Sequence, residues 1–318
     1  MDTYILEPIF LKPVFKERIW GGNKLKTMFH YNIPSNKTGE CWAISAHPNG
    51  ESVVTNGLYK GMTLGELYEE HRELFGYIND EKFPLLVKIL DANDDLSIQV
   101  HPNDEYANHY ENGELGKTEC WYVIDCNENA ELIYGHHAKN KEELTEMIEK
   151  QKWNQLLRKI SIQPGDFIYV PSGTVHALTK GTVVLEIQQS SDATYRIYDY
   201  DRLDDKGQLR ELHLDKAIDV IQVPHQDYLI QPVKTENQGL IITTFIKNET
   251  FTVKKWEIKG KAQSIQNQSF MLFSVLNGNG EIVKNSKSYT FKKGDHFILP
   301  FNFQDFLIKG EAKVIVSY

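Results

Sequence analysis

Short runs of β-branched and aromatic residues follow one another along most of the chain, and this pattern limits the possible folds more than any other feature. The runs are separated by Gly, Asn, Asp and Pro, the residues that turns require. Typical runs occupy residues 85–92, 118–125, 182–189, 251–258 and 269–276. Many short strands at fairly regular spacing predict a mainly β protein, built as a sandwich or a barrel.

Two segments have helical rather than strand character. One, near residues 63–78, starts with a capping box in which Thr63 caps the helix and Glu66 follows three residues later. The other, near residues 141–157, has apolar side chains at helical spacing. Shorter helices are expected after Pro102 and over residues 214–221. The helices therefore form a small annex to a β core.

One segment of the chain repeats. The first copy runs from Gly165 to His176 and the second from Gly294 to Asp305, and in both copies Gly-Asp is followed by a Pro six residues after the Gly. Each copy predicts a turn, a short strand and a Pro-directed turn. Two unrelated β-turns are one interpretation. Self-similarity at domain spacing favours the other, a duplicated barrel whose second copy lacks the histidine.

A chain of 318 residues is long enough for two domains. The stretch 223–233 contains two prolines and little periodicity, so we place the junction there. We predict a catalytic, metal-binding domain over residues 1–230, which carries both main helical segments. Residues 231–318 are predicted to form a second barrel without metal ligands.

Composition excludes some partners. The net charge of −9 gives no reason to expect nucleic acid, because that class of partner usually leaves a basic footprint. Three cysteines do not make a disulfide framework and indicate a reducing cytoplasm. The first residues lack the basic region of a signal peptide, and no apolar stretch is long enough to cross a membrane. The oligomeric state is not fixed by the sequence, and a monomer is compatible with it.

The first copy of the repeat fits the pattern G-x5-P-x-G-x2-H, which resembles the second signature motif of the cupin superfamily. In that family the histidine, here His176, is a metal ligand, and the fold is a jelly-roll β-barrel. Gln99-Val100-His101 resembles the front half of the first cupin motif, with Gln in place of the first histidine. We therefore expect two cupin-type barrels, with the helical annex on the first.

The spacing of the other candidate ligands has a physical reason. Alternate residues of a strand point to the same face, so Gln99 and His101 project together, as do Lys117 and Glu119. Imidazole and carboxylate ligands suit Zn²⁺ and leave a position open for substrate or water. Taken alone, His101 is more typical of a structural hydrogen-bonding histidine. Together with the complete motif at His176, these residues predict one zinc site per chain.

Over most of residues 5–203 the chain resembles the type I, zinc-dependent mannose-6-phosphate isomerases in their short bacterial form. The segments that carry the resemblance are PVFKERIWGG, IQVHPNDEYA, GKTECWYVID, PGDFIYVPSGTVHAL and EIQQSSDATYRIYDYDR. The resemblance implies that the zinc ligands are Gln99, His101, Glu119 and His176. It also implies that Arg196 and Lys117 are active-site residues, and that mannose 6-phosphate and fructose 6-phosphate interconvert through a zinc-stabilised cis-enediol.

Lys88 and Arg196 have structural alternatives. Lys88 lies in the middle of an apolar run, so its ammonium either reaches the substrate pocket or belongs to an edge-strand lysine that extends to solvent. Arg196 either binds substrate or pairs with Asp192, Asp199 or Asp201. The general base is left open among a lysine, a zinc-bound water and a carboxylate.

Two other functions remain in competition. A cupin dioxygenase would use iron, and a sugar-binding cupin would keep the fold without turnover. A Gln/His/Glu/His set with nearby cations fits a phosphorylated sugar better than oxygen chemistry. A binding cupin would be expected to have lost some ligand positions, whereas all four are filled in the first copy.

Overall fold

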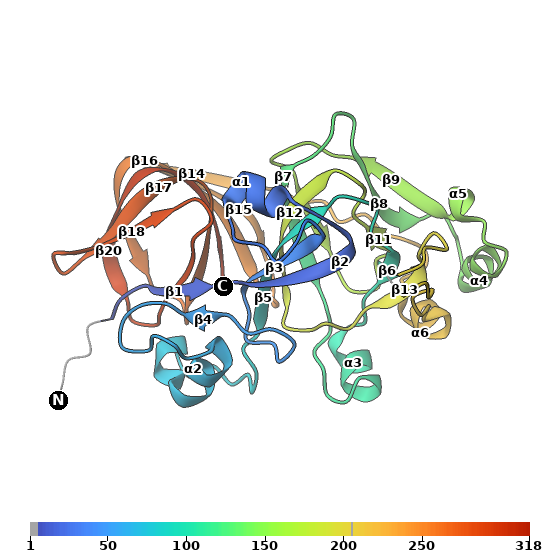
Figure 1. Ribbon diagram of the computed structural model, residues 1–318, viewed down its shortest axis with the longest axis horizontal. Helices are drawn as coiled ribbons and strands as arrows, with labels where there is room; N and C mark the ends of the chain where they lie inside the picture. The colour runs from blue at the N-terminus through green and yellow to red at the C-terminus, as the bar shows by residue number, and fades with distance from the viewer. Residues whose placement is uncertain (1–5, 205) are drawn as a thin grey trace.

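The computed structural model describes residues 6–204 and 206–318, which form two β-rich halves side by side (Figure 1). The half that contains the orange and red strands lies on one side, and most of the helices lie around the other half. All described helices fall between residues 24 and 220. The predicted mainly β fold with a small helical annex on its first part is confirmed.

The first half contains two antiparallel sheets. The six-stranded sheet has the order β10 (Phe167–Val170), β7 (Glu119–Asp125), β12 (Thr182–Gln189), β5 (Leu85–Ala92), β3 (Thr38–Ile44) and β2 (Val14–Gly22). The five-stranded sheet has the order β13 (Tyr195–Tyr198), β6 (Ile98–Val100), β11 (His176–Ala177), β8 (Glu131–His136) and β9 (Leu157–Ser161). Strands that are distant in sequence are neighbours in both sheets, which brings residues 88, 99, 119, 176 and 186 into one region.

The second half is a nine-stranded sheet that also includes two N-terminal strands. Its order is β14 (Val233–Asn237), β15 (Leu240–Lys247), β16 (Thr252–Gln266), β20 (Gln304–Ser317), β17 (Met271–Lys284), β19 (His296–Leu299), β1 (Ile9–Lys12) and β4 (Val53–Val54), with β18 (Lys287–Lys292) paired to β17. Among the described residues none of the three sheets closes on itself, so the expected barrels are open. The predicted domain division at residue 230 stays a prediction. Strand β1, from the predicted first domain, pairs with β19 of the predicted second domain.

Three of the seven described helices begin at a residue whose side chain caps them, namely Thr63, Asn103 and Asn140. The helices are α1 (Lys24–Phe29), α2 (Leu64–Glu70), η1 (Arg72–Phe75), α3 (Asp104–Tyr110), α4 (Lys141–Glu149), α5 (Trp153–Leu156) and α6 (Leu214–Val220). The predicted capping box is present, with Thr63 Oγ1 accepting from Glu66 N at 3.2 Å and Glu66 Oε2 accepting from Thr63 N at 2.8 Å. The single helix predicted over residues 141–157 is wrong: it is two helices, because Gln151 takes a left-handed φ of 51° between them. None of the described helices is long and apolar enough to cross a membrane.

The two copies of the repeat form the same local structure. Asp166 accepts a hydrogen bond from the backbone N–H three residues earlier at 2.9 Å, and Asp295 does the same at 2.8 Å. Gly173 has a φ of 83° and its counterpart Asn302 has a φ of 60°. Gly and Asn are the residues that tolerate this left-handed backbone, so both copies make the same turn. The duplication hypothesis is therefore supported at the level of individual hydrogen bonds.

One apolar core joins the two halves. Phe167 of β10 stacks on Phe245 of β15 with ring centroids 4.6 Å apart, and Phe83 lies 5.3 Å from Phe270. Burying one large apolar side chain contributes about 1.5–3 kcal/mol. These aromatic contacts therefore stabilise the packing of the second half against the first.

Candidate metal centre

Strand register places the predicted residues next to one another. In the five-stranded sheet Gln99 of β6 lies opposite His176 of β11 on one side and Arg196 of β13 on the other. In the six-stranded sheet Lys88 of β5 lies opposite Glu186 of β12. Residues directly opposite in antiparallel strands project from the same face. The two sheets thus bring groups that are almost a hundred residues apart to one place.

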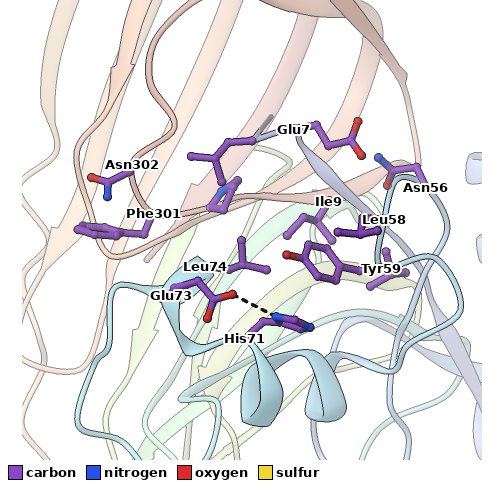
Figure 2. A pocket seen from close by; sticks show the side chains of 13 residues that line it. Glu7, Ile9, Asn56, Leu58, Tyr59, His71, Glu73, Leu74, Phe301 and Asn302 are labelled. Carbon is purple, nitrogen blue, oxygen red and sulfur yellow. Dashed lines mark hydrogen bonds and ion pairs between the residues drawn. The ribbon is translucent and has the colours of Figure 1, made fainter. Parts of the chain in front are cut away.

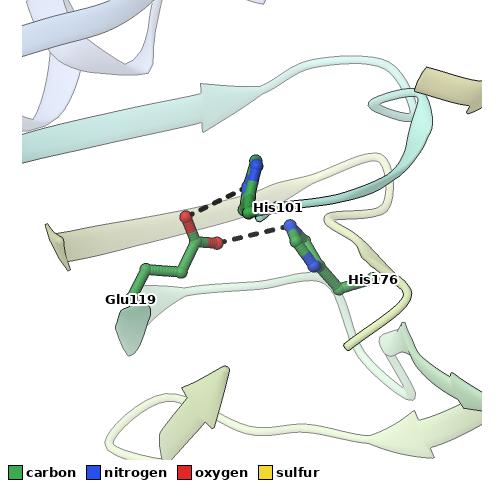
Figure 3. A group of neighbouring side chains, drawn as sticks. All are labelled: His101, Glu119 and His176. Carbon is green, nitrogen blue, oxygen red and sulfur yellow. Dashed lines mark ion pairs between the residues drawn. The ribbon is translucent and has the colours of Figure 1, made fainter. Parts of the chain in front are cut away.

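Three of the four predicted ligands form a compact group, which Figure 3 shows with both imidazoles facing one carboxylate. Glu119 Oε2 lies 3.4 Å from His101 Nε2, and Glu119 Oε1 lies 3.4 Å from His176 Nε2. One ligand atom from each residue lies within 4.8 Å of the others, and all three side chains are buried. The Gln99 amide lies 3.3 Å from His176 Nε2. All four predicted ligands are therefore in contact.

The hydrogen bonds of the two histidines show which ring nitrogen carries the proton. The other nitrogen, which faces the carboxylate, then has a lone pair. His101 Nδ1 donates to the carbonyl of Ala193 at 2.9 Å, and His176 Nδ1 donates to the carbonyl of Thr174 at 2.8 Å. A carbonyl only accepts, so the proton is on Nδ1. Burial lowers the pKa of His101 to about 3 and also lowers that of His176, so both rings are neutral near pH 7. Each Nε2 then presents a lone pair.

The carboxylate is also an acceptor. Burial alone would raise the pKa of Glu119, but the Lys117 ammonium outweighs it and holds that pKa well below its usual range. His101 Nε2 and both oxygens of Glu119 have no hydrogen-bond partner. Buried acceptors without a donor are costly unless a cation lies among them. The donor set of two imidazoles, one carboxylate and one amide therefore fits a divalent metal. Exchanging the amide O and N of Gln99 would turn its oxygen toward His176 Nε2, so that it could join the other acceptors in holding a metal.

A polar cleft of about 480 Å³ opens beside this group. Four of the predicted residues line it, namely Lys88, Gln99, Lys117 and Arg196. Lys117 Nζ lies 3.4 Å from Glu119 Oε2. Burial would lower the pKa of Lys117, but Glu119 and other nearby carboxylates raise it above its ordinary value. Lys117 is therefore a cation fixed between the metal group and the cleft.

The alternative reading of Lys88 as an edge-strand lysine is wrong. Strand β5 lies between β12 and β3, and Lys88 is 3% exposed. Its Nζ lies 3.6 Å from Glu186 Oε1 and 4.8 Å from the centre of the Trp42 ring. Lys88 and Glu186 form a buried ion pair in the wall of the cleft, and removing either residue would leave an unpaired buried charge. Whether it also contacts substrate stays a prediction.

The alternative reading of Arg196 as one half of a salt bridge is also wrong. Its Nε donates to Ser97 Oγ at 3.3 Å and its Nη1 donates to the carbonyl of Glu211 at 2.7 Å. No carboxylate among the described residues pairs with it. Asp199, one of the proposed partners, instead bonds two other arginines. Arg196 therefore lines the cleft as a cation that no described carboxylate bonds directly.

Sequence reasoning missed Glu186 and Arg210, which also line the cleft. Glu186 Oε2 accepts from Trp121 Nε1 at 2.9 Å, and burial together with the charge of Glu119 raises the pKa of Glu186. Glu186 could have been found from the sequence. It lies in the apolar run 182–189, and burying its carboxylate costs free energy for the same reason as burying the Lys88 ammonium. Arg210 lies in a polar segment that gave no signal.

A second cleft, of about 470 Å³, lies between the N-terminal segment, helix η1 and the turn at residues 300–302 (Figure 2). Its walls are mainly apolar, and His71 Nδ1 lies 3.0 Å from Glu73 Oε1. The described residues contain a potential metal-ligand group only at His101, Glu119 and His176, which do not line this cleft. Gln99 and Lys117, which contact this group, line the polar cleft instead.

Comparison with known proteins identifies the family. The family model "Phosphomannose isomerase type I, catalytic domain" matches residues 9–135, and "Mannose-6-phosphate isomerase, cupin domain" matches residues 241–318. The chain is 57% identical to mannose-6-phosphate isomerase ManA of Bacillus subtilis over 312 residues, covering 98% of this chain and 99% of that protein. The chain belongs to the type I phosphomannose isomerase family.

Two further relatives agree. Mannose-6-phosphate isomerase of Streptococcus mutans is 53% identical and covers 98% of each chain. The crystal structure of mannose 6-phosphate isomerase from Bacillus subtilis superposes with a TM-score of 0.97 at 58% identity, covering 98% of this chain and 99% of that one. The cupin-type fold expected from the repeat is therefore confirmed. The similarity also extends through the C-terminal half, where the sequence motifs alone gave a weak signal.

Proposed function

We propose that the chain interconverts mannose 6-phosphate and fructose 6-phosphate, with one Zn²⁺ per chain held by Gln99, His101, Glu119 and His176. The observation that carries the proposal is the buried group of acceptor atoms without a donor beside a cleft lined by cations. Relatives that match nearly the whole chain and are named mannose-6-phosphate isomerase support this substrate. Family membership also favours an isomerase over an iron dioxygenase or a sugar-binding cupin.

A metal in this site would supply a Lewis acid that stabilises negative charge on the substrate oxygens. With two neutral histidines, a neutral amide and one carboxylate, the net charge of the loaded site would be +1. The reaction moves a proton between C2 and C1 of the sugar through a cis-enediol. The residues of the chain therefore have to hold the sugar, neutralise its anionic oxygens and carry that proton.

The geometry supports a separate role for each residue. Lys117 has a raised pKa and stays protonated, so it binds anionic oxygens and is a poor base. Arg196, which has no carboxylate paired with it in the described part of the chain, orients the substrate and assists proton transfer. Glu186 lines the cleft with a raised pKa, as expected of a carboxylate that exchanges a proton near neutral pH. Among the bases that the sequence left open, a carboxylate thus has the most support. Lys88 holds Glu186 in place and lies close enough to the cleft to contact substrate.

We place the catalytic, metal-binding domain in residues 1–230 and a supporting domain without metal ligands in residues 231–318. Asp305, the counterpart of His176 in the second copy, is exposed, which supports this division. All three cysteines are free thiols, which supports a reducing cytoplasm. The partner is a small phosphorylated sugar.

The test is a coupled assay of mannose 6-phosphate turnover before and after chelation, with the metal content of the purified protein measured alongside. We expect turnover that chelation abolishes and zinc restores, with about one metal per chain. His176→Ala should lose both metal and turnover. His109→Ala, on the exposed face of α3, is the matched control and should keep both. Iron together with oxygen consumption, or absence of turnover in the zinc-loaded protein, would contradict the proposal.

A further inference from the structure

Strand β13, which carries Arg196, lies at the edge of its sheet and pairs with β6 alone. An edge strand has one row of backbone N–H and C=O groups that no neighbouring strand bonds. Residues 211–213, which lead into α6, lie along this edge and bond Arg196. The placement of Arg196 therefore depends on a segment outside the sheet.

Three hydrogen bonds join Arg196 to segment 211–213. His213 N donates to Arg196 O at 2.8 Å, and Arg196 N donates to His213 Nδ1 at 3.2 Å. The third runs from Arg196 Nη1 to the carbonyl of Glu211 at 2.7 Å. Among these three bonds, only the one to His213 Nδ1 uses a side chain of the segment. The identity of residue 213 therefore matters to how Arg196 is held.

The bond to Nδ1 also fixes the protonation state of the ring. The backbone N–H of Arg196 only donates, so Nδ1 accepts and the proton of the neutral ring is on Nε2. Nε2 lies 3.9 Å from a Glu211 carboxylate oxygen, which is beyond hydrogen-bond distance. A ring protonated on both nitrogens would place one N–H against another, so the bond to Arg196 exists only while His213 is neutral.

The surroundings of His213 favour the neutral ring. The groups that face it come from β13, the end of α3, α6 and segment 211–213 itself, namely Arg196, Tyr195, Glu111, Lys216 and Glu211. Burial and the Arg196 guanidinium lower the pKa of His213, and they outweigh the carboxylates. The ring is therefore neutral near pH 7 and accepts the hydrogen bond there.

We propose that His213 is a positioning residue for the isomerisation, whose Nδ1 holds the backbone of Arg196 so that the guanidinium lines the cleft. The inference rests on the proposed function, because it takes Arg196 as a residue that orients the substrate. Protonation of His213 breaks the bond and adds a second positive charge beside Arg196. Turnover is consequently lost where this ring titrates.

Two substitutions separate the acceptor from the rest of the side chain. His213→Asn retains an acceptor, because Asn Oδ1 is bonded to Cγ as Nδ1 is, and it does not titrate. His213→Leu fills a similar space without an acceptor. His109→Asn, on the exposed face of α3, is the control for loss of a histidine. The zinc-loaded enzymes are compared by kcat and KM for mannose 6-phosphate against pH, and by hydrogen exchange of the Arg196 amide read by mass spectrometry.

Near pH 7.5 we expect His213→Leu to lower kcat/KM about 3- to 10-fold, the value of one hydrogen bond, and to speed exchange of the Arg196 amide by a similar factor. His213→Asn should recover most of both. Below about pH 6.5 the parent and His109→Asn should lose kcat/KM relative to His213→Asn, because only they contain a His213 that becomes charged. The metal ligands titrate alike in all of these proteins, so the ratio isolates His213.

A double substitution shows whether His213 acts through Arg196. In an Arg196→Ala background, His213→Leu should change kcat/KM by less than about twofold. Additive effects of the two substitutions, or no recovery in His213→Asn, would overturn the proposal. If His213→Leu does not fold, the pH profiles decide, since identical profiles for the parent and His213→Asn would also overturn it.

Hydrogen exchange separates this inference from the proposed function. Normal turnover that is insensitive to His213 would overturn the inference alone. Absence of turnover in the zinc-loaded parent would overturn the proposed function, and the exchange of the Arg196 amide would still show whether His213 holds that residue.

Discussion

His296 should make the stability of the protein depend on pH independently of the metal site. Its ring is 1% exposed on β19, with Nε2 2.9 Å from the hydroxyl of Tyr31 and Nδ1 2.9 Å from that of Ser274. Both partners are neutral, and burial lowers the pKa of His296 to about 3. In the unfolded chain the pKa is about 6.5. The unfolded state therefore binds a proton that the folded state excludes, and stability falls as pH drops below about 6.5.

The linkage relation gives the size of the effect. Between about pH 7.5 and about pH 5.5 this one group should remove about 1.4 kcal/mol from the free energy of unfolding. Replacing the ring by a group that does not titrate, as in His296→Gln, should lower stability near pH 7.5 through poorer packing, but should remove this part of the pH dependence. The measurement is urea unfolding of parent and variant at both pH values.

The quantity compared is the change in the free energy of unfolding between the two pH values. The other buried histidines contribute equally to this change in parent and variant, so their contributions cancel. The same substitution at the exposed His109 is the control and should preserve the pH dependence of the parent. If parent and His296→Gln lose the same free energy between the two pH values, His296 is protonated in the folded state and the reasoning is refuted.

Three further predictions concern the metal, the cleft and the repeat. Saturating zinc should stabilise the protein by about 4 kcal/mol at a thousand times its dissociation constant, and His176→Ala should abolish this shift in thermal unfolding. Lys88→Met should cost about 3–5 kcal/mol in urea unfolding because it leaves Glu186 buried and unpaired, and replacing both residues by Met should cost less than Lys88→Met alone. Gly173→Ala should cost about 1–2 kcal/mol because its φ is 83°, whereas Asn302→Gly should change stability by less than about 1 kcal/mol.

Much of the fold follows from local chemistry. The run at residues 85–92 is strand β5, and the capping box at Thr63 starts α2 where it was expected. The break after α4 was not predictable, because Gln151 carries no sequence signal for a left-handed backbone. The pairing of β1 with β19 was not predictable either, since it joins residues almost three hundred positions apart.

Some residues of the candidate site could likewise be placed from the sequence, and others could not. Alternation along a strand was enough to place Gln99 beside His101 and Lys117 beside Glu119. Motif spacing could not show that Lys88 faces Glu186, because the register between β5 and β12 is set by packing across the sheet. Arg210 reaches the cleft from a polar segment through its bonds to Asp199, a tertiary relation without a local pattern.

The two copies of the repeat separate what holds the fold from what makes the site. The aspartate turn and the left-handed residue after the proline are present in both copies, with matching hydrogen bonds. These features build the strand and the turn, so they persist whether or not a metal is bound. The ligand position differs, because His176 is buried among acceptors whereas Asp305 is exposed. The Gly and Pro positions of the motif therefore predict architecture, and only its final histidine, together with partners from other strands, predicts chemistry.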